Sequence, residues 1–137
     1  RARRGEHRPL YYKIAREGRK INSDFTEAYM TVEMLANTAD FEPIYIADGE
    51  REILGGYAGE LLSWVMGRAK EGDAWVTIMS NVNIVAVCTL ADPACIVLAE
   101  GVRPDDEALR RAREQGVSII STRLDTFEAC VRIASAL

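Results

Sequence analysis

The sequence has no long hydrophobic run, only one histidine and no G-x-x-x-x-G-K-[ST] segment. It never approaches the roughly 18 consecutive apolar residues of a membrane-spanning helix, and its basic beginning lacks the apolar stretch of a signal peptide. The missing glycine-lysine segment argues against a P-loop kinase. The single histidine, His7, lies in a basic stretch without apolar periodicity, which argues against histidine-dependent triads and most zinc sites. We therefore expect a cytoplasmic protein that has no metal, no cofactor and no catalytic residues.

Cysteine is also scarce. The three cysteines, Cys88, Cys95 and Cys130, are odd in number, and no two of them have C-x-x-C spacing. This pattern does not suggest a disulfide framework or a metal site. All three lie in apolar segments, so we expect reduced thiols in the core of a cytosolic protein.

Length and charge indicate one domain with an extension. The 137 residues are 48% hydrophobic and 28% charged, which is ordinary for a globular domain with its own core. Residues 1–29 hold eight Lys or Arg against four Asp or Glu, whereas the remainder holds nine against seventeen. We expect a basic N-terminal extension over residues 1–29, with a short helix over Leu10–Lys20, and a domain over residues 30–137. The acidic domain argues against nucleic acid as its partner.

The centre of the chain predicts a β-α-β unit. Trp75–Met79 is a short apolar run rich in β-forming residues, which indicates a strand. Ile84–Leu90 is apolar almost all round, as in a buried helix, and Cys95–Ala99 indicates a second buried strand. Two strands joined by a helix are expected to be parallel, with a right-handed crossover.

The flanking segments continue this alternation. Thr31 and Asp125 or Thr126 are candidate N-caps, and Gly116 is a candidate helix stop. The other expected elements are a helix from Val32 to about Thr38, strands over Pro43–Ile46, Ile53–Ala58 and Val117–Ser121, and helices over Glu60–Lys70, from Asp105 or Asp106 to Gln115, and through Phe127, Cys130, Ile133 and Leu137. The predicted fold class is α/β, a mainly parallel sheet with helices on both faces, in a single compact domain plus the N-terminal extension.

Four short segments in a fixed order resemble one family. They are Gly49–Tyr57, Ala69–Val76, Asn83–Val87 and Ser121–Glu128. Together they resemble the DRTGG domain over about Thr31 to Ala134, with Glu50-Arg51-Glu52 at the Asp-Arg-Thr positions and Gly55 and Gly56 matching. Domains of this family occur beside CBS domains in some pyrophosphatases, in phosphotransacetylases and alone, and they are distantly related to the N-terminal region of HPr kinase. The resemblance implies a regulatory or dimer-forming role without established catalysis.

Three loops that follow the expected parallel strands form a candidate ligand site. In open α/β sheets, ligands bind beyond the carboxyl ends of the strands, at a topological switch point. Free N–H groups at a helix start and the fork of Arg123 suit a nucleotide or another small anion. The candidate residues are Ser80, Asn81, Asn83, Glu100, Gly101, Thr122, Arg123 and Asp125. The alternative is that Asn81, Asn83 and Asp125 only cap helices.

The adjacent glycines suggest a second site. Gly55 and Gly56 would weaken a strand, so they require either a bulge or the close approach of another backbone. We assign Arg51, Gly55, Gly56 and Tyr57 to a homodimer interface, since two-fold dimers are the commonest oligomers. Trp64 and Met66 belong either to that contact or to the core. The expected function is a non-catalytic regulatory and dimerisation module that senses a nucleotide or other anionic metabolite; the alternative is a protein-interaction subunit of a metabolic or redox complex.

Overall fold

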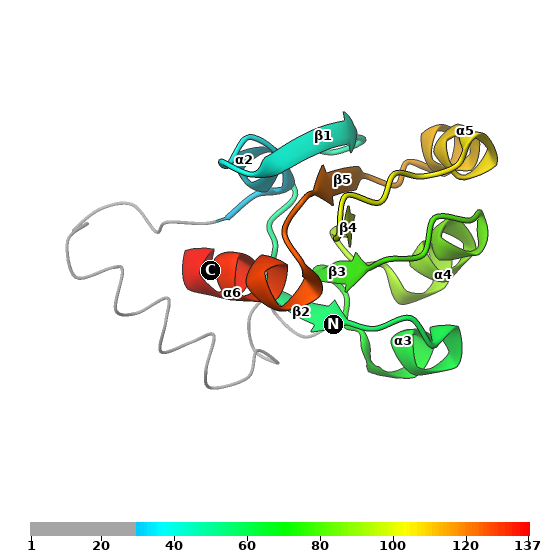
Figure 1. Ribbon diagram of the computed structural model, residues 1–137. Helices are drawn as coiled ribbons and strands as arrows, with labels where there is room; N and C mark the ends of the chain where they lie inside the picture. Colours follow the sequence, from blue (N-terminus) through cyan, green and yellow to red (C-terminus); the bar gives the residue numbers. More distant parts are fainter. Residues whose placement is uncertain (1–29) are drawn as a thin grey trace.

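A computed structural model describes residues 30–137 (Figure 1). The basic extension, its expected helix over Leu10–Lys20 and His7 lie outside the described residues. The strands are β1 (Phe41–Tyr45), β2 (Gly55–Ala58), β3 (Asp73–Thr77), β4 (Cys95–Leu98) and β5 (Ile119–Thr122). The helices are α2 (Val32–Ala36), α3 (Leu62–Arg68), α4 (Asn83–Ala91), α5 (Asp106–Gln115) and α6 (Thr126–Ala136). None of these helices is long and apolar enough to cross a bilayer.

The five strands form one sheet in the order β1-β5-β4-β3-β2. Strands β2 to β5 are parallel, and β1 is antiparallel to β5. The pairing of Trp75 with Ile96 confirms the predicted parallel β-α-β unit. The fold is therefore α/β with a mainly parallel sheet, as the alternation of strands and helices indicated.

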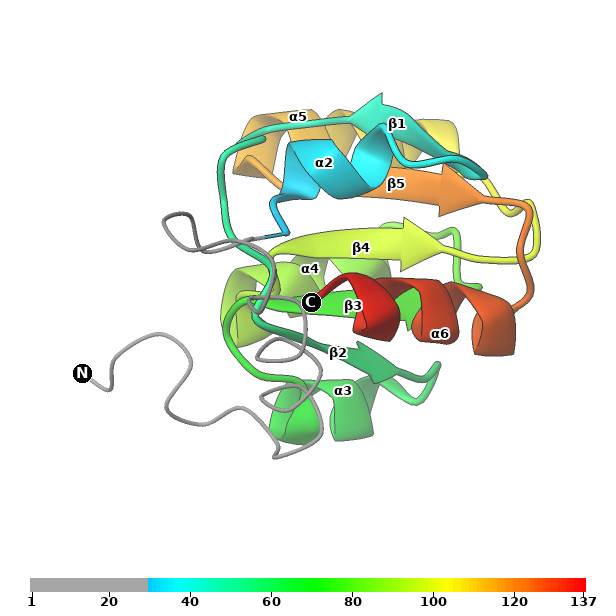
Figure 2. The same ribbon diagram turned by 90° about the vertical axis from the view of Figure 1, so that its left-hand side faces the viewer.

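Helices cover both faces of the sheet, as predicted. Figure 1 shows α2 and α6 on one side and α3, α4 and α5 on the other, and Figure 2 shows α2 and α6 in front of the strands. Each layer has its own core: Leu35 and Ile133 pack with Val97 on one face, and Val65 and Ile84 pack with Trp75 on the other. The central strands are buried on both faces, which explains their continuous apolar sequence.

Several predicted helix ends are confirmed by side-chain bonds. The Thr31 hydroxyl accepts from the Met34 N–H, and the Asp125 carboxylate accepts from the Glu128 N–H at 2.8 Å. Asp105 is the N-cap of α5, and Gly116 ends that helix at φ +68°. These caps were predictable because each depends on a local hydrogen bond or on one left-handed residue.

Some boundaries and burial predictions were wrong. Strand β1 begins before Pro43, at Phe41, and β2 begins at Gly55 rather than at Ile53. Helix α4 is not buried all round, because it covers the sheet from outside and leaves Leu90 70% exposed. Phe127 is 75% exposed because the buried side of α6 carries Ala129, Ile133 and Leu137, which lie four residues apart.

The cysteines and the side chains of α3 differ in burial. Cys88 and Cys95 are buried free thiols, whereas Cys130 is only partly buried. Trp64 is 51% exposed and Met66 is exposed as well, so neither side chain belongs to the core. Helix α3 buries Val65 instead, which leaves Trp64 at the surface.

Candidate functional site

The loops of the predicted ligand site lie at the carboxyl edge of the sheet. Strand β4 leads into α5 on one face, whereas β5 leads into α6 on the other (Figure 1). Adjacent parallel strands whose connections leave on opposite faces define the position where α/β sheets bind ligands. The topology therefore creates such a position between Glu100-Gly101, after β4, and Arg123, after β5.

Backbone hydrogen bonds join these two loops directly. The Glu100 N–H donates to the Leu124 carbonyl, and the Gly101 N–H donates to the Thr122 carbonyl, both at 2.8 Å. Glu100 and Gly101 have φ values of +60° and +73°, and the Val102 N–H closes the turn on the Ala99 carbonyl. Two consecutive left-handed residues are typical of a type I′ turn, in which glycine is favoured. The N–H groups of Glu100, Gly101 and Val102 are therefore used within the chain.

The loop after β3 is also stabilised internally. The Ser80 carbonyl accepts from the Asp105 N–H at 3.0 Å, which links this loop to the start of α5. The Asn81 side chain accepts from the Asn83 N–H at 2.9 Å, so Asn81 stabilises the turn before α4. Asn83 is the first residue of α4 and makes no capping bond of its own. Sequence reasoning grouped these residues with Arg123; they lie at the predicted carboxyl edge, but they follow β3, whereas Arg123 follows β5, and β4 lies between the two strands.

Thr122 and Asp125 have structural partners. The buried Thr122 hydroxyl donates to the Asp40 carbonyl and accepts from the Leu124 N–H. Asp125 caps α6. Both side chains therefore hold the loop after β5 in place, as the capping alternative proposed for Asp125.

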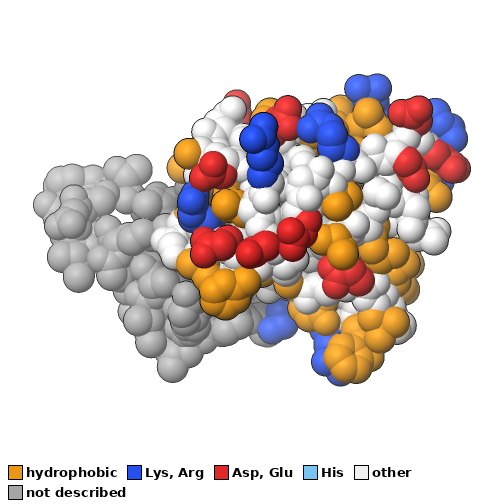
Figure 3. Space-filling model, viewed as in Figure 1, with side chains coloured by type: hydrophobic (Ala, Val, Ile, Leu, Met, Phe, Trp, Pro, Cys, Tyr) orange, Lys and Arg blue, Asp and Glu red, His pale blue; other side chains and the backbone are white. Residues whose placement is uncertain are grey.

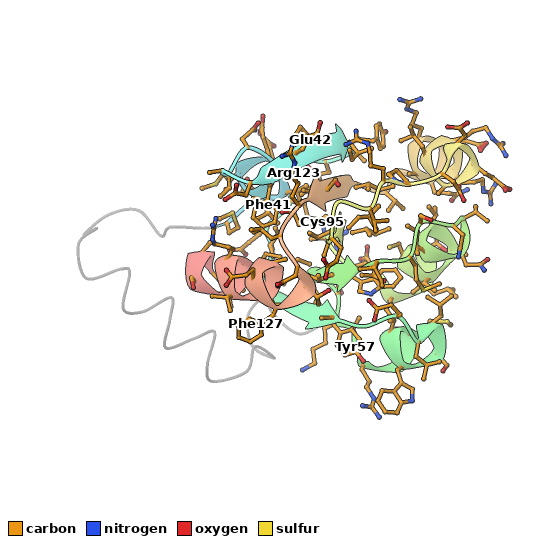
Figure 4. The ribbon with its side chains drawn as sticks, viewed as in Figure 1. Phe41, Glu42, Tyr57, Cys95, Arg123 and Phe127 are labelled. Carbon is orange, nitrogen blue, oxygen red and sulfur yellow. The ribbon has the colours of Figure 1, made fainter. Side chains whose placement is uncertain are left out.

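Arg123 differs from the other basic residues. It is exposed, and it is the one basic side chain among residues 30–137 for which the structure shows no hydrogen bond, ion pair or ring contact. The other arginines contact a carboxylate or lie over an aromatic ring. Figure 4 shows Arg123 at the β1 end of the molecule, where Phe41 pairs with Thr122. Its guanidinium is available to an external anion.

Carboxylates surround this edge. Exposed acidic residues follow the parallel strands or begin α6, namely Glu60, Glu100, Asp125 and Glu128. Figure 3 shows a row of Asp and Glu side chains across this side of the molecule. Within residues 30–137 no group of His, Cys, Asp or Glu is arranged to hold a metal ion. Any anion that binds here must rely on Arg123 against an acidic background.

The buried titratable groups lie away from this edge and are not activated. Burial raises the pKa of the Cys95 thiol to about 12, and burial likewise raises the pKa of Cys88. Thiols with raised pKa values stay protonated and are poor nucleophiles. Burial also raises the pKa of Asp73, which accepts a 2.8 Å hydrogen bond from the Lys70 N–H at the start of β3.

The predicted dimer site lies at the opposite end of the sheet from Arg123. Strand β2 is an edge strand of the described sheet, and Gly55 and Gly56 pair only with β3 on their inner side. Tyr57 is half-buried and Ala58 is exposed. Figure 4 shows Tyr57 and Phe127 at this end of the molecule.

Arg51 has a different role from the predicted one. Its guanidinium donates to the carboxylate and to the main-chain carbonyl of Asp92, both at 2.8 Å, and its side chain is 22% exposed. Asp92 ends α4 in the left-handed conformation. Arg51 thus ties the chain before β2 to the end of α4, and no longer belongs in the interface that we propose below.

Exposed apolar side chains lie on and just before α3, the helix that follows β2; sequence reasoning had assigned two of them, Trp64 and Met66, either to the dimer contact or to the core. Leu61, Trp64 and Met66 of the α3 region are all about half exposed, and the Arg68 guanidinium lies 3.6 Å from the centre of the Trp64 ring. Leu61 and Trp64 are three positions apart and share one side of the helix, whereas Met66 lies on the opposite side from Trp64; we call Leu61 and Trp64 the α3 patch.

Comparisons with known proteins agree with the fold. The crystal structure of the CBS and DRTGG domains of the regulatory region of Clostridium perfringens pyrophosphatase, complexed with the activator diadenosine tetraphosphate, is similar at a TM-score of 0.58 and 16% identity. The alignment covers 93% of this chain and 56% of that chain. No curated protein sequence matches.

A family model assigns the sequence. The model of the DRTGG domain matches residues 60–136, more than half of the chain. The Gly49–Tyr57 segment lies outside this match, so the match lends no support to the alignment of Glu50-Arg51-Glu52 with the family's name-giving residues. The later segments, from Ala69 to Glu128, lie inside it. The chain belongs to the DRTGG domain family.

Proposed function

We propose that this chain is a non-catalytic regulatory module that forms a homodimer through its β2 edge. The observation that carries the proposal is the β2 edge, which pairs with no further strand of residues 30–137 and has two adjacent glycines, no charge and no proline. Glycines allow two backbones to approach closely, and an open edge offers unpaired backbone groups to a second strand. The α3 patch supplies apolar area next to that edge.

The absence of catalysis is supported by the chemistry of the described residues. Residues 30–137 contain no histidine, and the two buried thiols are held in the protonated form. The carboxyl edge uses its polar groups to bond its own loops. The similarity to a regulatory region of a pyrophosphatase supports a regulatory role.

Light scattering at micromolar concentration tests the dimer. We expect the mass of two chains for the parent protein and of one chain for Gly56→Arg and for Ala58→Lys. Both changes place a charge on the β2 edge, and Ala58 is exposed, so its variant is expected to keep the fold. Glu42→Lys adds the same charge to the β1 edge and is expected to leave the dimer intact. A parent protein with the mass of one chain, or an unchanged mass in both β2 variants, would reject this interface.

A second function, anion sensing, is favoured by the unpaired guanidinium of Arg123. Arginine binds phosphate and carboxylate groups through paired hydrogen bonds, and charge-assisted bonds are the strongest of their kind. The related pyrophosphatase region was solved with a dinucleotide, so adenine nucleotides are the first ligands to test. We propose that a phosphoryl group contacts Arg123 between the loops that follow β4 and β5.

Thermal unfolding with ATP, ADP, AMP and inorganic phosphate tests the anion site. A ligand that binds only the native state raises stability, by about 2.7 kcal/mol at a hundredfold excess over its Kd. We expect a rise in Tm for the parent protein that disappears in Arg123→Gln. Arg103→Gln, which changes a paired arginine of the same edge, is expected to keep the rise. An equal shift in all three proteins would exclude Arg123, and no shift with any ligand would favour the protein-interaction subunit.

A further inference from the structure

A groove between α4 and α5 lies apart from Arg123 and from the β2 edge, and Asn83 is the one predicted ligand-site residue that lines it. Its volume is about 420 Å³, within the range of small-molecule sites. Helices α4 and α5 lie side by side on the outer face of the sheet (Figure 1). The groove is lined by Val82, Asn83, Val85, Ala86, Thr89, Glu107, Arg110, Arg111 and Gln115.

The lining residues form one stripe on each helix. On α4 they are three or four residues apart, and on α5 the positions 107, 110, 111 and 115 have the same helical spacing. Both helices lead from the carboxyl end of one strand to the start of the next, so they run in the same direction. The accessible apolar side chains, which we call the floor, are Val82 and Ala86, because Val85 is only 1% exposed, and one wall carries Arg110 and Arg111.

The two arginines of this wall are held loosely. Arg110 lies 3.4 Å from Glu114 and 4.0 Å from Glu107, and Arg111 lies 4.0 Å from the same Glu114. All of these side chains are largely exposed, and exposed pairs of this length contribute little. By contrast, Arg51 and Arg103 each contact a carboxylate at 2.8 Å. Arg110 and Arg111 can therefore exchange their carboxylate partners for a ligand.

We propose that this groove binds a small anion with a compact apolar body. The acidic group contacts Arg110 and Arg111 through the bidentate geometry that guanidinium groups favour, and the apolar body lies on Val82 and Ala86. The charges of the lining favour an anionic ligand, because the lining holds two arginines and one glutamate in a domain with a net negative charge. This site is independent of Arg123 and of the β2 edge.

The probe 8-anilino-1-naphthalenesulfonate tests the groove, because it joins an aromatic body to one acidic group and its fluorescence increases in apolar sites. We expect saturable binding to the parent protein, about tenfold weaker in the double variant Arg110→Gln, Arg111→Gln. Ala86→Leu places a larger side chain on the exposed floor and is expected to abolish this binding. Arg113→Gln, on the same helix, changes an arginine that lies 6.0 Å from the Tyr45 ring and is expected to leave the affinity within about twofold.

A neutral probe with the same aromatic body, N-phenyl-1-naphthylamine, separates the contribution of the apolar floor from that of the two arginines. We expect Ala86→Leu to weaken its binding and the double arginine variant to leave it unchanged. Circular dichroism verifies that each variant is folded. Binding of the sulfonate probe that is unaffected by Ala86→Leu would place the probe elsewhere and overturn the proposal. Equal loss in Arg113→Gln and in the double variant would show a general charge effect and overturn it as well.

Discussion

The two edges of the sheet differ in how they are protected. Strand β1 carries Pro43, a register shift between Pro43 and Tyr45, and Glu42, which pairs with Arg103 at 2.8 Å. Strand β2 has two glycines, a half-buried tyrosine and an exposed alanine. Proline, irregular register and charge are the usual means by which proteins prevent edge-to-edge association. The contrast supports the proposal that this protein associates through β2 while β1 is kept free of such contacts.

Removing the protection of β1 is expected to have the largest effect. The double variant Glu42→Val, Pro43→Val restores a backbone donor and removes the charge, so both edges become open. A dimer with two further open edges extends into chains, because each new contact leaves another edge exposed. Light scattering should show a mass that exceeds the dimer and rises with concentration. Glu42→Val alone, which keeps Pro43, should have the parent mass, and a double variant with that mass would contradict the contrast.

The attachments of the two edges also differ in strength. The Trp75 indole donates to the Gly59 carbonyl at 2.9 Å, at the end of β2, and is fully buried. Trp75→Phe leaves a cavity and an unsatisfied acceptor, so we expect a loss of about 2 to 3 kcal/mol in the free energy of unfolding.

At the β1 end, the Thr122 hydroxyl bonds the Asp40 carbonyl at 2.6 Å. Thr122→Val keeps the shape and removes this bond, so we expect a loss of about 1 to 2 kcal/mol. Urea denaturation of both variants measures the difference. A larger loss of unfolding free energy in Thr122→Val than in Trp75→Phe would contradict the expectation that β2 is attached more strongly than β1.

A third prediction compares the arginine next to each edge. Arg51→Gln removes two hydrogen bonds to Asp92 at a partly buried position, and we expect a loss of about 1 to 2 kcal/mol. Arg103→Gln breaks an exposed pair with Glu42, for which about 0 to 1 kcal/mol is typical. When urea denaturation is repeated at high salt, the loss of unfolding free energy in Arg103→Gln should shrink more than the loss in Arg51→Gln, because salt screens exposed charges. Equal losses of unfolding free energy in Arg51→Gln and Arg103→Gln would contradict the expected difference between the partly buried arginine and the exposed one.

The smallest expected effect concerns pH near β2. Asp73 pairs with Gly55, and burial raises the pKa of its carboxyl group in the folded state. A raised folded pKa favours the protonated form, so this contribution to stability is present at low pH and is lost as pH rises through the folded pKa. Asp73→Asn, which keeps an oxygen acceptor for the Lys70 N–H, should be more stable than the parent at neutral pH, with the difference shrinking in acid. A difference independent of pH would show that Asp73 does not titrate in this way.

Local features of the fold could be predicted from the sequence. Thr31 and Asp125 cap their helices and Gly116 ends α5, because each of these roles depends on residues at most four positions apart. The apolar runs of β3 and β4 identified central strands because only strands buried on both faces are apolar throughout.

Which side of each helix is buried was harder to predict from the sequence. Leu90, which the pattern placed in a buried helix, and Phe127, an apolar position of the predicted last helix, are both exposed. Each helix touches the sheet on one side only, and the direction of that side depends on where neighbouring elements pack. The same reason explains Trp64, for which core and surface were left as alternatives.

The sequence by itself determined the elements, their caps, the α/β class and the family, because these follow from periodicity and from short-range hydrogen bonds. Only the tertiary structure decided that β2 is an open edge, that Arg51 binds Asp92, and that the loops after β4 and β5 bond each other and leave Arg123 free. These properties depend on strand order and on partners 21 to 41 positions away, for which no local pattern exists.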